Sequence, residues 1–303
     1  MAISHSTWMT DLGDSLANRS LSELCLPGSH HAGMYNLGHR TLFASDAGSR
    51  TQYDTIAGQL RGGARVLDLR PALWTDHTWH CGHFSADPRL SWQGATGESL
   101  TDALNSVAAF AAAFPRELVI LRFSGYRNCV TWAGFGPMEK AQLAELVLRH
   151  LGERLIRAGV GDAGLADRPI HRLMASNRSL LVLFDDFEGF TAPERGLMAA
   201  ADLDIHGEDT PSDRADEIAQ AQVQRLRDHS PAAGRLFQLS WYGARVSPAS
   251  PSLYAQAQVL NPALAAAIPA RRDRGMPNIL LTDYVRPAVT DIAIRINLIP
   301  LGP

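Results

Sequence analysis

The sequence predicts an α/β fold in which strands and helices alternate and a parallel sheet closes into a barrel. Short apolar segments are separated by stretches with helical periodicity, an alternation typical of parallel sheets. The chain has 303 residues, which suits one barrel of roughly 250 residues with insertions. The GxGxxG fingerprint of an open dinucleotide-binding sheet is missing after the first strand. No linker, repeat or low-complexity stretch divides the chain, so we expect a single domain spanning residues 1–303.

The predicted strands are short, apolar in the middle and bounded by turn residues. They are Leu21–Pro27, Arg65–Leu73, Thr78–Phe84, Glu117–Ser124, Ser179–Phe184, Leu236–Trp241 and Asn278–Tyr284. An eighth strand is not evident in the sequence.

Three helices are predicted between these strands. Ser99–Phe114 repeats its apolar residues on one stripe, and Pro137–Ala158 opens with a proline in its first turn. Pro211–His229 carries acidic residues early and Arg225 and Arg227 late, as the helix dipole favours.

Composition excludes several classes of protein. A net charge of -3 and no basic run argue against nucleic-acid binding. No Sec-type signal peptide and no run of about 18 apolar residues is visible. We expect a soluble monomer, cytoplasmic or exported by a route other than Sec.

The three cysteines are expected to pack in the core. Cys25, Cys81 and Cys129 form no CxxC pair, so core packing is their expected role.

The ends of the predicted strands are unusually polar. In a barrel, the residues at the carboxyl ends of the strands converge on one mouth. Several histidines, an arginine and carboxylates at one rim would be costly to desolvate unless they served one another, so they indicate a functional site. The polar residues at the ends of the predicted strands are His30 and His31, Asp68 and Arg70, His80 and His83, Arg122 and Ser124, Asp185 and Asp186, and Asp283.

Motifs across most of the chain resemble the catalytic domain of bacterial, metal-independent phosphatidylinositol-specific phospholipase C. Leu26-Pro27-Gly28-Ser29-His30 resembles the family's first motif, the segment from Gln59 to Arg70 its second, and Gly82-His83-Phe84 its third. The segments 114–121 and 280–284 are similar to a later helix-to-strand junction and to the closing strand.

The resemblance implies a distorted (β/α)8 barrel that cleaves inositol phospholipids without a cofactor. His30 would be the general base for the inositol 2-hydroxyl, oriented by Asp283. His83 would be the general acid for the diacylglycerol oxygen, assisted by Asp68. Arg70 would hold the phosphate where animal-type relatives place calcium, and the first product would be a cyclic inositol phosphate.

Each implied role also has a physical reason. An imidazole with a pKa near 6.5 acts as acid or base near neutral pH, and each such proton transfer contributes about 10²–10⁴-fold. A neighbouring hydroxyl on the substrate makes the attack intramolecular, with effective molarities of roughly 10⁵–10⁸ M. A guanidinium is permanently charged and binds two phosphate oxygens at once.

The chain departs from the family pattern in places that bear on the substrate. His31 stands where the family usually has a carboxylate or amide, and Ser124 where bacterial enzymes tend to offer a lysine near the inositol. Arg122 is the candidate substitute for that lysine. His31, Arg122, Ser124, Asp185 and Tyr242 are accordingly the candidate substrate-binding residues, with Tyr242 stacking on the sugar ring or simply packing.

Some alternatives stay open at this stage. His77, His80 and His83 lie close together, and the Gly82-His83-Phe84 setting favours His83 as the acid. Trp132 and Phe135 could enter a bilayer surface or pack over the barrel wall.

Three other functions compete with the phospholipase interpretation. His30, His31 and His83 with a carboxylate could bind zinc, as in a metal-dependent glycerophosphodiesterase, although Arg70 in the same space would repel a cation. The other two are a non-catalytic lipid-binding module and a related barrel adapted to another cyclase or lyase reaction.

Overall fold

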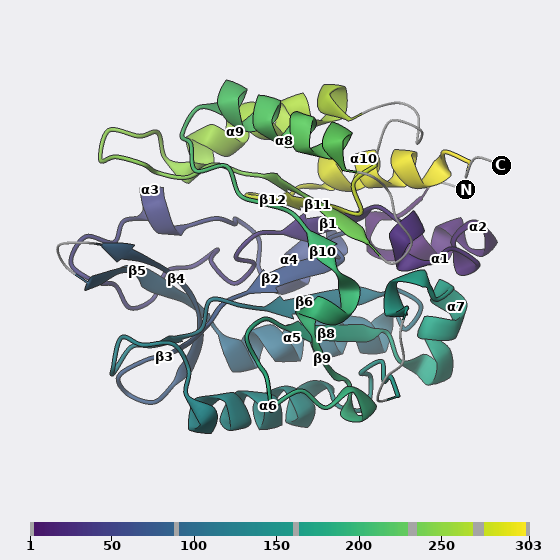
Figure 1. Cartoon of the computed structure of the whole chain (residues 1–303), viewed down its shortest axis with the longest axis horizontal. Helices are drawn as coiled ribbons and strands as arrows, with labels where there is room; N and C mark the ends of the chain where they lie inside the picture. Colours follow the sequence, from purple (N-terminus) through teal and green to yellow (C-terminus); the bar gives the residue numbers. More distant parts are fainter. Residues whose placement is uncertain (1–2, 88–90, 160–163, 230–234, 269–275, 301–303) are drawn as a thin grey trace.

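The computed structural model describes residues 3–87, 91–159, 164–229, 235–268 and 276–300. Its main sheet has eight parallel strands in the order β10-β11-β12-β1-β2-β6-β8-β9 (Figure 1). In the described ranges no ladder joins β9 to β10, so the fold is a distorted TIM barrel. The strands are β1 Leu26–Ser29, β2 Val66–Leu69, β6 Val119–Phe123, β8 Leu180–Phe184, β9 Leu197–Ala199, β10 Ile205–His206, β11 Leu236–Trp241 and β12 Ile279–Thr282.

Most of the barrel strands are buried on both faces, which is why they read as continuous apolar runs, whereas both residues of β10 are only half-buried. In β2, Leu67 and Leu69 pack in one core cluster with the helices outside the sheet, whereas Val66 belongs to a second cluster with Trp8 and Leu181. Alternate residues of each strand therefore face the helical layer and the barrel interior.

Helices cover the outside of the sheet (Figure 1). The α-helices are α1 Trp8–Leu12, α2 Asp14–Ala17, α3 Asp46–Ser49, α4 Ile56–Arg61, α5 Leu100–Ala113, α6 Pro137–Leu151, α7 Ile170–Leu173, α8 Ala215–Asp228, α9 Leu253–Ala267 and α10 Pro287–Leu298. The three predicted helices are confirmed, but α6 ends at Leu151 because Gly152 follows it, and α8 begins at Ala215. None of the described helices is long and apolar enough to cross a bilayer.

A second sheet stands beside the barrel, in the order β5-β4-β3-β7 (Figure 1). Its strands are β3 Pro71–Leu73, β4 Trp79–Asp87, β5 Ser91–Ser99 and β7 Arg127–Asn128. The expectation that Thr78–Phe84 forms a barrel strand is wrong, because β4 pairs antiparallel with β3 and β5. The predicted strand Arg65–Leu73 is also divided: the chain leaves the barrel at Arg70 and enters the second sheet.

Short elements account for the remaining differences from the prediction. The predicted strand Leu21–Pro27 starts as a 3-10 turn, Leu21–Glu23, capped by Ser20 and Glu23, and the strand begins only at Leu26. Five further 3-10 turns are His5–Thr7, Leu165–Asp167, Ala175–Asn177, Pro193–Arg195 and Ala200–Leu203. β9 and β10 have only three and two residues, too few to leave a strand pattern in the sequence.

Candidate active site

A cavity of about 270 Å³ lies at the carboxyl ends of the barrel strands. Its walls bring together side chains from the ends of β1, β2 and β11, from the β4–β5 hairpin and from the loop after β10. They include His30, His31, Arg70, His83, Asp209 and Tyr242. Asp283 and Asp68 stand directly behind this wall, as their contacts with His30 show.

His30 and Asp283 form a buried pair. The parallel register of β1 and β12 sets Ser29 beside Thr282, which places the two following residues side by side. His30 Nδ1 lies 2.7 Å from Asp283 Oδ1, and Asp283 is only 1% exposed. Burial raises the pKa of Asp283, while the adjacent His30 opposes that rise. The pair fixes the ring so that Nε2 remains available on the cavity side.

Asp68 connects His30 with Arg70. Asp68 Oδ2 lies 4.0 Å from His30 Nε2 and 3.6 Å from Arg70 Nε, and it accepts the backbone N–H of His31 at 3.1 Å. Burial acts to raise the pKa of Asp68, but Arg70, His30 and the His31 N–H together lower it. Asp68 is therefore a carboxylate at neutral pH, and Arg70 is held beside it with part of its guanidinium facing the cavity.

His83 reaches the site from the hairpin rather than from a barrel strand. Its Nδ1 donates to the carbonyl oxygen of Ser49 at 3.2 Å. Desolvation, reinforced by the charges of His30 and Arg70, lowers the pKa of His83 to about 3. His80 instead contacts Thr78 and His39, and His77 lies in an exposed turn. Of the three clustered histidines, the structure brings His83 to the cavity.

His31 lies between the other two imidazoles. Its ring centre is 4.2 Å from that of His30 and 4.1 Å from that of His83. Its backbone has a φ of 42°, a left-handed conformation uncommon outside glycine and often found at functional sites. Desolvation, with Arg70 and the two histidines, lowers its pKa well below the usual value. His31 Nδ1 is buried without a hydrogen-bond partner among the described residues.

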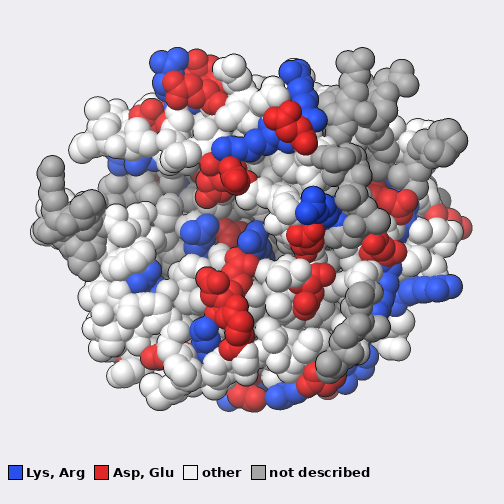
Figure 2. Space-filling model, viewed as in Figure 1, with Lys and Arg blue, Asp and Glu red and all other residues white. Residues whose placement is uncertain are grey.

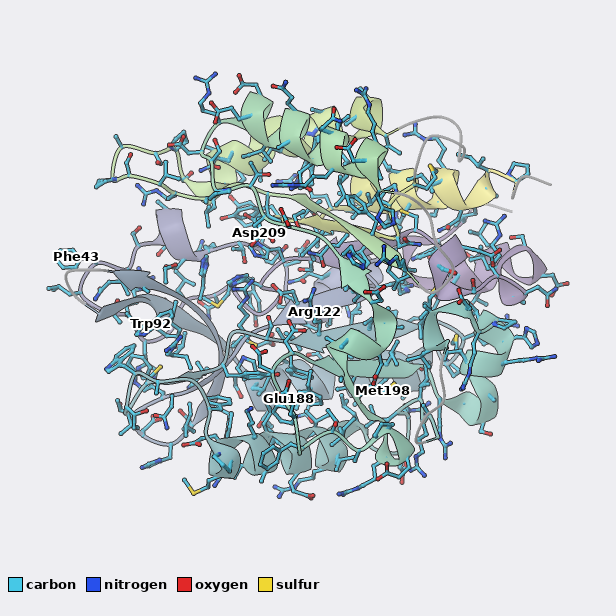
Figure 3. The ribbon with its side chains drawn as sticks, in the orientation of Figure 1. Phe43, Trp92, Arg122, Glu188, Met198 and Asp209 are labelled. Atoms are coloured by element: carbon cyan, nitrogen blue, oxygen red, sulfur yellow. The ribbon has the colours of Figure 1, made fainter. Side chains whose placement is uncertain are left out.

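Tyr242 packs against His30, with the two rings parallel within 9° and their centres 3.6 Å apart. The Tyr242 hydroxyl donates to Asp209. One face of the phenol is therefore covered by the enzyme, which favours the packing interpretation over stacking on a sugar. Asp209, labelled in Figure 3, was not among the predicted site residues, because it follows a two-residue strand without a motif.

Arg122 and Asp185 form a separate polar pair. Arg122 Nη2 lies 3.0 Å from Asp185 Oδ2, and its Nη1 donates to Gln238 at 3.4 Å. Neither residue lines the cavity described above. Ser124 donates instead to Asp68 at 3.4 Å.

Comparison with solved structures decides the fold family. A phosphatidylinositol-specific phospholipase C from Listeria monocytogenes superposes with a TM-score of 0.70 at 17% identity, covering 97% of this chain and 99% of that one. One from Staphylococcus aureus gives a TM-score of 0.67 at 16% identity, covering 96% and 97%. The chain has the bacterial phosphatidylinositol-specific phospholipase C fold.

Sequence comparison agrees with this phospholipase C fold. A PI-PLC X-box domain-containing protein of Dictyostelium discoideum is 26% identical over 135 residues, which is 41% of this chain and 17% of that protein. The chain thus matches less than a fifth of the length of this curated relative. No family model matches the chain.

Within the phospholipase C fold, the structure decides between the two roles left open for Phe135. Phe135 is 8% exposed and packs against Trp79 and Tyr126, with ring centres 5.2 and 5.3 Å apart. Phe135 therefore takes the packing role and not the role at a bilayer surface. Trp132 is half-buried beside Trp74 and Phe84.

The site residues of this phospholipase C fold can also be considered as ligands for a metal ion. Donor atoms of His30, His31 and Asp68 all lie within 4.8 Å of one another. Two imidazoles and a carboxylate are a ligand set that suits zinc. The Arg70 guanidinium, however, is 3.6 Å from the same Asp68 oxygen, and its positive charge opposes a divalent cation there.

Proposed function

We propose that the protein cleaves phosphatidylinositol-type lipids to diacylglycerol and a cyclic inositol phosphate without a metal. The fold supports the coarser statement, that it is a phosphodiesterase acting on phospholipids. The observation that carries the finer proposal is the buried His30–Asp283 pair facing Arg70 and His83 across one cavity. A base, an acid and a phosphate-binding cation are together the groups that this reaction requires.

In the proposed first step, His30 Nε2 takes the proton from the inositol 2-hydroxyl. The freed oxygen attacks phosphorus, so a new O–P bond forms inside the substrate, and the bond from phosphorus to the diacylglycerol oxygen breaks. His83 gives its proton to that leaving oxygen. Asp283 stabilises the His30 imidazolium that forms, since its carboxylate is 2.7 Å away.

Arg70 is proposed to hold the phosphate during this step. Its guanidinium can donate to two phosphate oxygens and offsets the negative charge that develops on them. Asp68 orients Arg70 from behind through the 3.6 Å contact at Nε. This leaves the terminal nitrogens of the guanidinium for the substrate.

A zinc-dependent phosphodiesterase is the second candidate, and the cluster of His30, His31 and Asp68 favours it. In that reaction, the metal would activate a water molecule and the product would be a linear phosphate. The position of Arg70 and the commitment of Asp68 to it favour the metal-free reaction.

The decisive assay is incubation with phosphatidylinositol vesicles in excess EDTA, followed by ³¹P NMR of the soluble products. We expect a cyclic phosphate, and no turnover in His30→Ala or His83→Ala proteins whose circular dichroism is unchanged. Phosphatidylcholine and glycerophosphodiesters in parallel reactions define the headgroup. Full activity in either variant, or activity that EDTA abolishes and zinc restores, would refute the metal-free mechanism.

We also propose that the protein contacts the lipid surface through Leu42 and Phe43. These side chains are 84% and 62% exposed, and the Phe43 N–H donates to Gln93 of the hairpin. Figure 3 shows Phe43 at the tip of the molecule beyond β4 and β5. Exposed adjacent apolar side chains of this kind indicate an interaction surface.

Charge does not dominate the face shown in Figure 2, where acidic and basic side chains are interspersed. We therefore expect binding to uncharged vesicles as well as to anionic ones. In sedimentation assays with phosphatidylcholine vesicles, Leu42→Ser/Phe43→Ser should weaken binding at least about tenfold, since each apolar side chain contributes about 1.5–3 kcal/mol. Val259→Ser, at an exposed position of α9, is the matched control. Equal binding by both variants would contradict the proposal.

A further inference from the structure

Gln52 is a buried side chain that joins the two strand ends carrying the proposed base and its carboxylate. It is only 1% exposed. Its Nε2 donates to the carbonyl oxygens of His30 at 2.8 Å and Thr282 at 3.2 Å, and its Oε1 accepts the backbone N–H of Val285 at 3.0 Å. One amide group therefore contacts the backbone just beyond β1 and the backbone on either side of Asp283.

The proposed base and its carboxylate lie one residue beyond the end of the β1–β12 ladder. The parallel register runs as far as Ser29 beside Thr282. Both chains then leave the extended conformation, because His31 and Tyr284 have left-handed backbones with φ values of 42° and 49°. Strand pairing alone therefore does not fix the backbone that follows the ladder on either chain.

We propose that Gln52 is a positioning residue that fixes the 2.7 Å contact between His30 and Asp283. This role rests on the proposed function. Buried backbone groups need hydrogen-bond partners, and the Gln52 amide supplies them at the point where the ladder ends. Gln52 is not among the residues that line the cavity, so it acts through the His30–Asp283 pair and not on the substrate.

The chemistry of the amide matches these contacts. Its nitrogen carries two N–H groups, one for each carbonyl oxygen, and its oxygen accepts the remaining N–H. A glutamate would set a carboxylate against two carbonyl oxygens. A methionine would fill nearly the same volume but would leave the backbone groups beside the pair unpaired.

The segment that contains Gln52 also holds other parts of the site. Thr51 Oγ1 donates to the His31 carbonyl oxygen at 3.0 Å, and the Ser49 carbonyl oxygen accepts from His83 at 3.2 Å. Residues 49–52 thus contact the backbone of the proposed base and the ring of the proposed acid. Within this segment, Gln52 is the residue whose side chain bridges the two strands, so its substitution isolates the bridge.

Gln52→Met tests the role, and Asn278→Leu is its matched control. Asn278 is a buried amide at the opposite end of β12, where it donates to the carbonyl oxygens of Ser22 and Leu24 and accepts the N–H of Phe237. Both variants should lower the free energy of unfolding in urea to a similar extent. If Gln52→Met does not fold, Gln52→Ala with Asn278→Ala replaces the comparison, since the smaller side chain leaves room for water.

The vesicle assay in EDTA should separate the two variants. We expect Gln52→Met to lose about 10²-fold in kcat with little change in KM, because misplacing a reacting group by about 1 Å costs that much. Asn278→Leu should keep the wild-type kcat. Combining Gln52→Met with Asp283→Asn should cost about 10³-fold, as expected for Asp283→Asn alone, whereas independent losses would multiply to about 10⁵-fold.

The His30 Nδ1–H proton supplies a readout that needs no turnover. A proton in a short hydrogen bond to a carboxylate gives a low-field ¹H NMR signal, which its loss in His30→Gln assigns. We expect this signal in the wild type and in Asn278→Leu, and its upfield shift or disappearance in Gln52→Met.

The proposed role of Gln52 would be overturned by any of three results. They are equal kcat values for Gln52→Met and Asn278→Leu, losses that multiply in the double variant, and a low-field signal that Gln52→Met leaves unchanged. If the wild type cleaved no phosphatidylinositol but lost the signal in Gln52→Met alone, the proposed function would fail while the positioning of the pair would stand.

Discussion

Replacing Asp283 by asparagine isolates the electrostatic part of the proposed base. The amide has nearly the shape of the carboxylate, and its oxygen can still accept the Nδ1–H of His30 across the 2.7 Å contact. What the substitution removes is the negative charge that stabilises the His30 imidazolium during attack. We therefore expect kcat to fall while KM and the fold stay close to those of the wild type.

The size of the effect follows from the geometry. With Nδ1 and Oδ1 in hydrogen-bond contact, the centres of the two charges are about 4 Å apart. At an effective dielectric constant of about 20, unit charges at that distance interact by about 4 kcal/mol. Each 1.36 kcal/mol in the activation free energy is tenfold in rate. The expected loss in kcat is thus about 10³-fold.

The assay is the initial rate of release of water-soluble inositol phosphate from phosphatidylinositol vesicles in EDTA. Asp291→Asn is the matched control, because Asp291 makes a similar 2.8 Å contact with His5 on the surface, where Asp291 is 65% exposed. That variant should keep full activity. If Asp283→Asn lost less than tenfold, or if the control lost as much, the assigned role of the His30–Asp283 pair would be wrong.

Three further substitutions are predicted. Arg70→Lys should cost about 10–100-fold in kcat/KM in the same vesicle assay, since a lost charge-assisted hydrogen bond is worth about 1.5–3 kcal/mol; activity near that of wild type would exclude bidentate phosphate binding. Glu117→Gln should lower the free energy of unfolding in urea by about 3–5 kcal/mol, because it leaves the charge of the fully buried Arg65 without a compensating carboxylate; a loss below about 1 kcal/mol would refute this. Burial raises the pKa of Glu98 to about 7 from 4.5, so the folded protein holds a proton that the unfolded chain releases, and stability falls as pH rises through that window. Glu98→Gln should make urea midpoints less dependent on pH between 4.5 and 7, and an unchanged slope would contradict the assignment.

The barrel strands could be predicted because burial on both faces gives them continuous apolar runs. β11 begins and ends at the predicted residues, Leu236 and Trp241. β5 was missed, since its sequence is rich in glycine and polar residues and its extended form is imposed by pairing with β4. Gly94 illustrates this: a Cβ atom there would lie 1.9 Å from the His83 carbonyl oxygen, a contact that only the paired hairpin creates.

The candidate site was only partly visible in the sequence. Strand ends and motif resemblance singled out His30 and Asp283, and the register of β1 with β12 explains why residues 253 positions apart meet. The partner of His83 could not be foreseen, because it is a backbone carbonyl, that of Ser49. Asp209 could not be foreseen either, since a two-residue strand sets its position.

The hairpin sets both the position of the proposed acid and the charges around it. By folding over the barrel end, β4 and β5 bring the half-buried His83 ring within 4.1 Å of the His31 ring. Arg70 and His30 also face His83, and together with desolvation they oppose a positive charge on its ring. The neighbouring carboxylates each have another contact, Asp68 with Arg70, Asp283 with His30 and Asp209 with Tyr242. The strength of His83 as an acid therefore depends on the balance of these surrounding groups, and substitutions of Arg70 or Asp68 should change it as well as phosphate binding.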